Sequence, residues 1–209
     1  MGGSGTGTPV TPMTDIGIRL VSLTDLKTFI EKTDTVHDSL LKMIIENVSA
    51  SIETYLNRNL LKAARTVYRD AGRRYYYLPA YPIDESATLT VTYDGTLQTK
   101  DTGYFVRADD GLIEFQKSVV PIYTDPKEIV IVWTGGYAAS ADNECLDVPY
   151  DMKEAALRQS AYNFRRRKDI GISSISMPDG SISKNPIDAF LLPEVKDLLR
   201  NYRRPAGEY

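Results

Sequence analysis

The chain has little of the chemistry on which most enzymes and metal sites depend. Its 209 residues include one histidine, His37, and one cysteine, Cys145. A single cysteine excludes an internal disulfide and is typical of a reducing compartment. Structural zinc sites need four Cys or His ligands, which this chain does not have. Any Ser–His or Cys–His pair would have to use His37, and no nucleophile motif accompanies it. We therefore predict no catalytic residue, no metal site and no cofactor.

Two further shortages narrow the location and the partners of the protein. No apolar run approaches the roughly 20 residues that cross a bilayer, so we expect no contact with a membrane. The amino terminus lacks the basic start and apolar core of a signal peptide. The net charge of −3 does not provide the strong basic excess typical of dedicated nucleic-acid binders. A hydrophobic fraction of 42% and a charged fraction of 25% are those of an ordinary globular domain.

Helical periodicity dominates residues 22–58, after a Gly- and Thr-rich arm (residues 1–17) that we expect to be flexible. Ser22 and Asp25 resemble a capping box that begins a short helix. We expect this short helix to bury Leu23, Leu26, Phe29 and Ile30. The next pattern runs from Val36 to Arg58 and predicts a long helix. We expect it to bury Leu40, Leu41, Ile44, Ile45, Val48, Ile52, Tyr55 and Leu56. A stripe this wide must be covered by other helices.

Residues 63–137 change to an alternating pattern and predict five or six short antiparallel strands. Asp94-Gly95 and the turn at residues 109–111 are hairpin signals. Residues 128–133 are nearly all β-branched or aromatic, so we expect them to form the most buried strand. Helices are predicted over residues 149–167 and within 187–202. The predicted fold class is α+β: an α-helical bundle body with an antiparallel β-rich middle segment, in one domain spanning residues 18–202.

The charged and tyrosine-rich segments have several interpretations. The basic run Arg165, Arg166 and Arg167 suits either a helix C-terminal cap or a subunit interface, with contact to DNA as a third possibility. The acidic residues between 142 and 151 could hold a cation, although the dipole of the following helix explains them more simply. The chain holds fourteen tyrosines. Stacking on bases would need a basic groove as well, so we favour protein interfaces.

Two segments are candidate docking elements. Residues 169–185 read as a loop or an extended hairpin whose apolar residues are too sparse to form a core. These residues are Ile172, Ile175, Met177 and Ile182. The second element is the chain end, where residues 203–209 are expected to be a flexible tail that becomes ordered on binding. Its candidate contact residues are Tyr202, Arg203, Arg204 and Tyr209, because Tyr and Arg are frequent among binding hot spots.

The order of these segments resembles the head–tail connector (adaptor, or head-completion) proteins of tailed bacteriophages. Residues 20–60 resemble the family's opening, in which a short helix and an acidic turn precede a long helix with a Tyr-x-x-Arg end, here Tyr55 and Arg58. Residues 130–137 resemble its strand that ends in Gly-Tyr, here Gly136 and Tyr137. Residues 148–167 resemble its Val-Pro helix that ends in arginine. The resemblance covers residues 20–202 and leaves the Gly- and Thr-rich arm unexplained.

The resemblance implies a structural virion protein, assembled in the host cytoplasm and located at the head–tail junction. It implies a homo-oligomeric ring, in the family about a dozen copies (a dodecamer), that sits under the portal protein. The ring would extend the DNA channel and offer a docking surface to a stopper or tail-completion protein. Genomic DNA would pass through without specific binding, since phosphate binding depends on Lys and Arg contacts. The alternatives are a DNA-binding accessory protein of packaging, which would need a basic face, and a small phage-encoded hydrolase, which would need a catalytic constellation.

Overall fold

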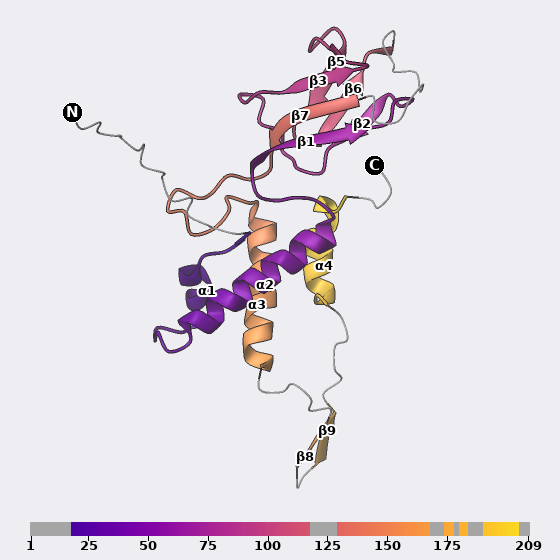
Figure 1. The fold of residues 1–209 in the computed structure, drawn as a ribbon. Coiled ribbons are helices and arrows are strands. Elements are labelled where there is room, and N and C mark those ends of the chain that lie inside the picture. Colours follow the sequence, from indigo (N-terminus) through magenta and orange to yellow (C-terminus); the bar gives the residue numbers. More distant parts are fainter. Residues whose placement is uncertain (1–17, 118–128, 168–173, 178–179, 184–189, 205–209) are drawn as a thin grey trace, which may run out of the picture.

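The structure is a computed structural model and describes residues 18–117, 129–167, 174–177, 180–183 and 190–204. It is a mixed fold of helices and antiparallel sheets, which confirms the predicted α+β class at that level (Figure 1). The predicted arm over residues 1–17 lies outside the described part. Within that part, no helix is both long and apolar enough to cross a lipid bilayer.

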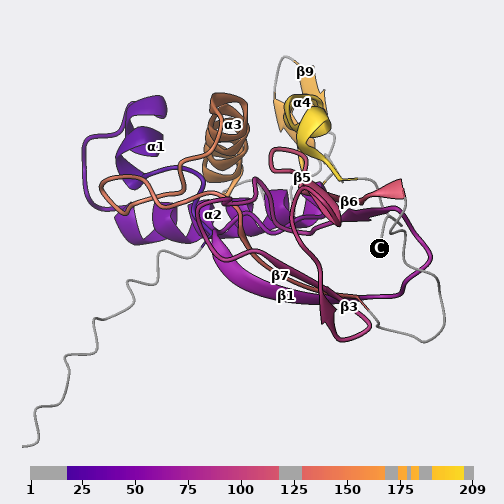
Figure 2. The same ribbon diagram turned by 90° about the horizontal axis from the view of Figure 1, so that it is seen from above.

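In the part of the chain that the structure describes, four α-helices form one half of the molecule. Their bounds are α1 (Leu23–Phe29), α2 (Asp38–Leu56), α3 (Tyr150–Arg166) and α4 (Pro193–Leu199), and a 3₁₀ turn, η2 (Arg200–Tyr202), follows α4. Figure 2 shows α1, α3 and α4 lying side by side over α2. The Ser22 hydroxyl accepts a hydrogen bond from the Asp25 N–H at 3.0 Å, which confirms the predicted cap of α1. Helix α2 ends at Leu56, and the next residue, Asn57, adopts a left-handed conformation.

Most of the apolar stripe predicted for α2 is buried under the other helices, while Leu40 and Tyr55 are only partly buried. Its buried residues are Leu41, Ile44, Ile45, Val48, Ser49, Ile52 and Leu56. They share one hydrophobic core with Leu26, Met152, Phe164 and Val195 from the neighbouring helices. The prediction for α1 was wrong at Phe29, which is 41% exposed. Helix α1 is only seven residues long and packs through Leu26, so Phe29 falls outside the covered side.

Two antiparallel sheets form the other half and pack face to face around a second core. One sheet has the order β1 (Ala63–Arg69), β7 (Ile129–Gly135), β3 (Thr90–Tyr93), β4 (Thr96–Leu97). The other has the order β2 (Tyr75–Tyr77), β6 (Leu112–Phe115), β5 (Tyr104–Arg107). The core between them holds Ile129, Ile131 and Trp133 from one sheet and Tyr76, Ile113 and Phe115 from the other. The described part of this middle segment holds seven strands rather than the predicted five or six, because β2 and β4 are separate short strands.

The strand predictions hold in detail where the turn chemistry was strong. Strand β7 pairs with β1 on one side and β3 on the other, and its inward residues are fully buried. The predicted turn at Asp94-Gly95 joins β3 to β4, with positive φ at both residues. The turn ending at Gly111 joins β5 to β6. The predicted hairpin within residues 169–185 is present as β8 (Ser174–Met177) paired antiparallel with β9 (Gly180–Ser183).

The hairpin lies apart from the two sheets. Figure 1 shows β8 and β9 beyond the C-terminal end of α3, on the far side of the helices from the sheets. In its register Ile175 pairs with Ile182, and Met177 pairs with Gly180. Ile172 lies outside the described residues. A hairpin of two four-residue strands is marginally stable by itself, so it needs another surface to be stable.

The two chain segments that connect the helices to the sheets run together. The Tyr137 N–H donates to the Leu60 carbonyl at 2.7 Å, and the Lys62 N–H donates to the Tyr137 carbonyl at 2.9 Å. Gly136 allows this approach, because its φ is +108° and a Cβ there would lie 2.7 Å from the Leu60 oxygen. The connection between the halves is therefore a paired, hydrogen-bonded strap rather than a single loop.

Candidate functional site

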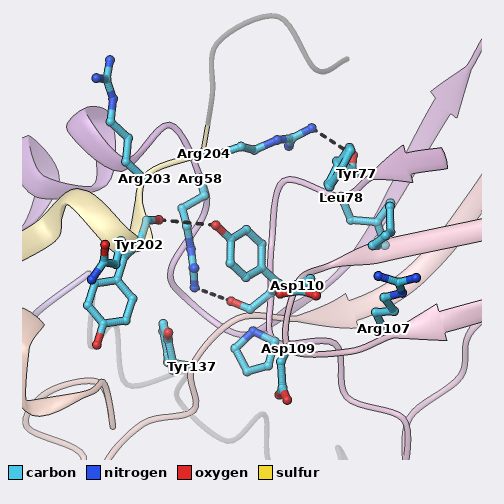
Figure 3. A pocket seen from close by; sticks show the side chains of 14 residues that line it. Arg58, Tyr77, Leu78, Arg107, Asp109, Asp110, Tyr137, Tyr202, Arg203 and Arg204 are labelled. Carbon is cyan, nitrogen blue, oxygen red and sulfur yellow. Dashed lines mark hydrogen bonds between the residues drawn. The ribbon is translucent and has the colours of Figure 1, made fainter.

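A pocket of arginine and tyrosine side chains lies where the helices meet the sheets (Figure 3). Arg58 follows the end of α2 and is buried, with 5% of its surface exposed. Its guanidinium carbon lies 3.4 Å from the centre of the Tyr81 ring and 5.3 Å from that of Tyr137. Its Nη2 also donates a hydrogen bond to the Tyr81 carbonyl at 2.5 Å. Arg58 thus fixes the end of α2 to the chain before β3 and to the end of the β7 strap.

The chain segment after η2 closes the same pocket. The Arg204 backbone N–H donates to the Leu56 carbonyl at 3.0 Å, which satisfies a carbonyl at the end of α2. The Arg204 Nη2 donates to the Tyr77 carbonyl at 3.0 Å, and the residue is buried. Arg203 is exposed, and its guanidinium carbon lies 5.1 Å from the centre of the Tyr55 ring. The sequence placed both arginines in a flexible tail; the structure corrects this, because both contact α2 or the sheets.

Tyr202 links this segment to α3. Its hydroxyl donates to an Asp151 carboxylate oxygen at 3.1 Å, and its carbonyl accepts a hydrogen bond from the Tyr81 hydroxyl at 3.4 Å. Burial, together with the hydrogen bond and the negative charge of Asp151, raises the pKa of the Tyr202 phenol. Tyr202 is therefore held within the protomer, and Tyr209 lies outside the described residues.

The basic run at the end of α3 divides into different environments. Arg167 donates a hydrogen bond to the Phe164 carbonyl and lies 3.8 Å from the centre of the Phe164 ring, so it caps the helix. Arg166 donates to the Tyr162 hydroxyl at 2.6 Å. Arg165 is exposed to solvent. The capping interpretation thus describes Arg167, while Arg165 is the member of the run that faces outward.

The residues that the sequence offered as candidates for catalysis or metal binding make packing contacts or hydrogen bonds within the protomer. The His37 ring packs edge-on against Phe164 at a centroid distance of 5.6 Å, and the His37 carbonyl accepts a hydrogen bond in the first turn of α2. Cys145 is buried. Hydrogen bonds from the Ser140 hydroxyl and a backbone N–H lower the pKa of Asp142. Among the described residues, no three His, Cys, Asp or Glu side chains gather closely enough to hold a metal ion.

Comparison with known proteins explains why these elements occur together. The profile of the head completion protein family matches residues 19–205. The chain belongs to the head completion protein family. The resemblance found in the sequence is confirmed, and the family is a structural one. No curated protein matches the chain.

Solved structures share the fold of this head completion protein. One is a chain from the neck of an empty gene transfer agent (GTA) particle, computed with C6 symmetry. It is 19% identical, and the match covers 90% of this chain and 92% of that chain, with a TM-score of 0.56. A chain from the virion of a native gene transfer agent (GTA) particle is 16% identical, covering 96% of this chain and 97% of its own, with a TM-score of 0.54. At these identities the likeness establishes the architecture over nearly the whole chain.

The pocket around Arg58, which joins the helices to the sheets and is called the junction below, was not predicted as a site. The sequence nevertheless held a signal for it. The Tyr-x-x-Arg end of α2 and the Gly-Tyr end of β7 were both recognised as family-like motifs. The structure brings them together, since Arg58 lies beside the Tyr137 ring. The remaining partner, Tyr81, lies in a loop segment with no motif. What the family-like motifs share is a role in joining the two halves of the head completion protein.

Proposed function

We propose that this head completion protein is a structural subunit of the neck of a tailed phage or phage-like particle. About a dozen copies form a ring under the portal protein, and this ring extends the DNA channel that leaves the head. The ring offers its far surface to a stopper or tail-completion protein. The match of the family profile over residues 19–205 is the observation that carries this proposal. The neck and virion origin of the two structurally similar chains supports it.

The charge distribution fits a channel that DNA crosses without being held. The net charge is −3, and two members of the one dense basic run, Arg166 and Arg167, already contact aromatic side chains of their own helix. Phosphate binding needs several free Lys or Arg contacts on one face. A DNA-binding accessory role would be detected as a salt-dependent mobility shift with duplex DNA, and we expect none.

We assign the β8–β9 hairpin to contact with the portal or with a neighbouring subunit. It lies beyond the helices and carries Ile175, Met177 and Ile182 on two short strands. Deleting residues 175–182 should leave the protomer folded and prevent ring formation or portal binding. The measurement is the melting temperature together with the mass of the complex formed with the portal. A deleted protein that no longer folds would show that the hairpin belongs to the protomer core.

The proposed function is tested by removing the gene and supplying it from a plasmid. Without the protein, we expect DNA-filled heads that lose their DNA and carry no tails. Supplying the wild-type chain should restore tailed particles, with the protein located at the neck by electron microscopy. Complete, infectious particles in the absence of the protein would refute the proposal.

A further inference from the structure

The outer face of the four-stranded sheet carries no charged side chain. The register aligns the outward residues of its strands, with Thr66 and Thr90 both opposite Val132, and Tyr68 and Thr92 both opposite Val130. The complete outward set is Ala64, Thr66, Tyr68, Val130, Val132, Thr134, Thr90, Thr92 and Leu97. A sheet face that meets water usually carries polar and charged residues. We call this set the uncharged face.

The uncharged face is also open to solvent in the described protomer. Tyr68 is 57% exposed and Leu97 is 65% exposed, although both are large and apolar. An ion pair joins Lys62 and Asp84 at 2.8 Å at the border of this face, just before β1 and beside the end of β7. Thr and Val side chains with one Tyr and one Leu form a flat surface that is easily dehydrated, since it holds no charge to desolvate.

The three-stranded sheet is the other layer of the sandwich (Figure 2), and its own outer face carries exposed aromatic residues. Phe105 and Tyr75 lie on either side of Glu114 in the register, and 41% and 45% of their surfaces are exposed. Both oxygens of the Glu114 carboxylate accept hydrogen bonds from arginines, Arg74 at 2.6 Å and Arg107 at 3.2 Å. We call these residues the aromatic face. Its one acidic group is already paired within the protomer.

We propose that the uncharged face of one subunit packs against the aromatic face of the next copy in the ring. This inference rests on the proposed ring and names the surface that closes it. A closed ring needs a heterologous contact, in which two different patches on opposite sides of each subunit meet. The two faces of the sandwich satisfy that requirement, because they lie on opposite sides of a two-layer core. Their chemistry is compatible. Threonine hydroxyls of the uncharged face can accept hydrogen bonds from N–H groups of Arg74 and Arg107 that Glu114 does not use, and no like charges meet.

The size of the uncharged face defines how much of the ring contact it can supply. Same-face residues lie about 6.8 Å apart along a strand and strands about 4.8 Å apart, so each outward side chain covers about 30 Å². The whole face then covers on the order of 300 Å², compared with about 800 Å² per partner in a stable interface. The sandwich contact therefore supplies somewhat more than a third of such an interface. The helices or the β8–β9 hairpin must supply the rest.

Site-directed crosslinking in assembled particles tests the contact. Cys145→Ser gives a background without cysteine, into which Thr66→Cys places a thiol on the uncharged face and Phe105→Cys one on the aromatic face. Particles carrying both changes are treated with a short bismaleimide and resolved on a denaturing gel. We expect a ladder of multimers from the double variant and only monomer from either single variant. Dimers from a single variant would show that a face packs on itself, and would overturn the proposal.

A charge inserted into the face provides a second, independent readout. Thr66→Lys should leave the melting temperature of the protomer within the range of the control variant Thr99→Lys, because both positions are exposed. We expect Thr66→Lys to lower incorporation into particles roughly tenfold or more, since a buried unpaired charge weakens a contact strongly. Thr99→Lys should incorporate normally. Normal rings of Thr66→Lys that fail to attach tails would assign the face to the stopper and refute this inference while leaving the neck function intact. Absence of the wild-type protein from the neck would refute both.

Discussion

The junction at Arg204 predicts that two truncations of the chain end will have different effects. Removing residues 203–209 deletes the Arg204 N–H bond to the Leu56 carbonyl, the Arg204 side-chain bond to Tyr77, and the Arg203 contact with Tyr55. A hydrogen bond from a charged group contributes about 1.5–3 kcal/mol and a neutral one about 1 kcal/mol. An exposed cation–π contact adds about 0.5–1 kcal/mol. We expect the free energy of unfolding to fall by about 3–5 kcal/mol.

Removing residues 205–209 instead keeps every one of these contacts and should leave stability unchanged. For a chain of this length each kcal/mol corresponds to about 2–4 °C in melting temperature. The longer truncation should therefore melt about 6–20 °C below the shorter one in a circular-dichroism thermal scan. Arg204→Met, which keeps the side-chain volume and the backbone bond, should give an intermediate value. Equal melting temperatures for both truncations would refute the assignment of Arg204 to the fold.

Three further predictions concern the two cores and the strap between them. Ile52→Ala should destabilise the protein by about 2–5 kcal/mol, whereas the exposed control Met43→Ala should change the melting temperature little. Hydrogen bonds, first of all from Lys62, lower the pKa of Asp84 to about 2. This carboxylate therefore contributes stability above its unfolded pKa that is lost as the pH falls toward 2, and Asp84→Asn should flatten the stability profile between pH 4 and 2. Gly136→Ala should cost about 1–3 kcal/mol in chemical denaturation, because its positive φ and a nearby carbonyl oppose a Cβ; an unchanged midpoint would contradict the strained strap.

The parts of the fold that could be predicted from the sequence are those set by local chemistry. Three- and four-residue spacing located α2, and the Asp94-Gly95 pair located a hairpin, because periodicity and turn geometry are properties of adjacent residues. The error at Phe29 arose from the same rule. In a helix of two turns the spacing defines a side, but the neighbouring elements decide how far the cover extends along it.

The candidate site could be predicted only in fragments, because its contacts join distant segments. Arg58, Tyr81 and Tyr137 come from three connections that meet only after both cores have formed. Arg204 looked like part of a loose tail since Pro205 and Gly207 follow it, and no local rule indicates that its N–H meets the end of α2. The uncharged face likewise became visible once the register had assigned the outward residues of each strand.

The structure gives Arg58 a role that charge alone does not explain. Its Nε is buried and has no hydrogen-bond partner among the described residues, which costs about 1–3 kcal/mol. The stacking on Tyr81 at 3.4 Å and the bond to the Tyr81 carbonyl offset this cost, and both need a planar group with several donors. Lysine would keep the charge but lose the stacked plane. Together with the strap and the bonds made by Arg204, the planar contact at Arg58 helps to set the angle between the helical core and the sandwich core. If the hairpin beyond the helices binds the portal while the sandwich faces close the ring, that angle determines whether one protomer can make both contacts.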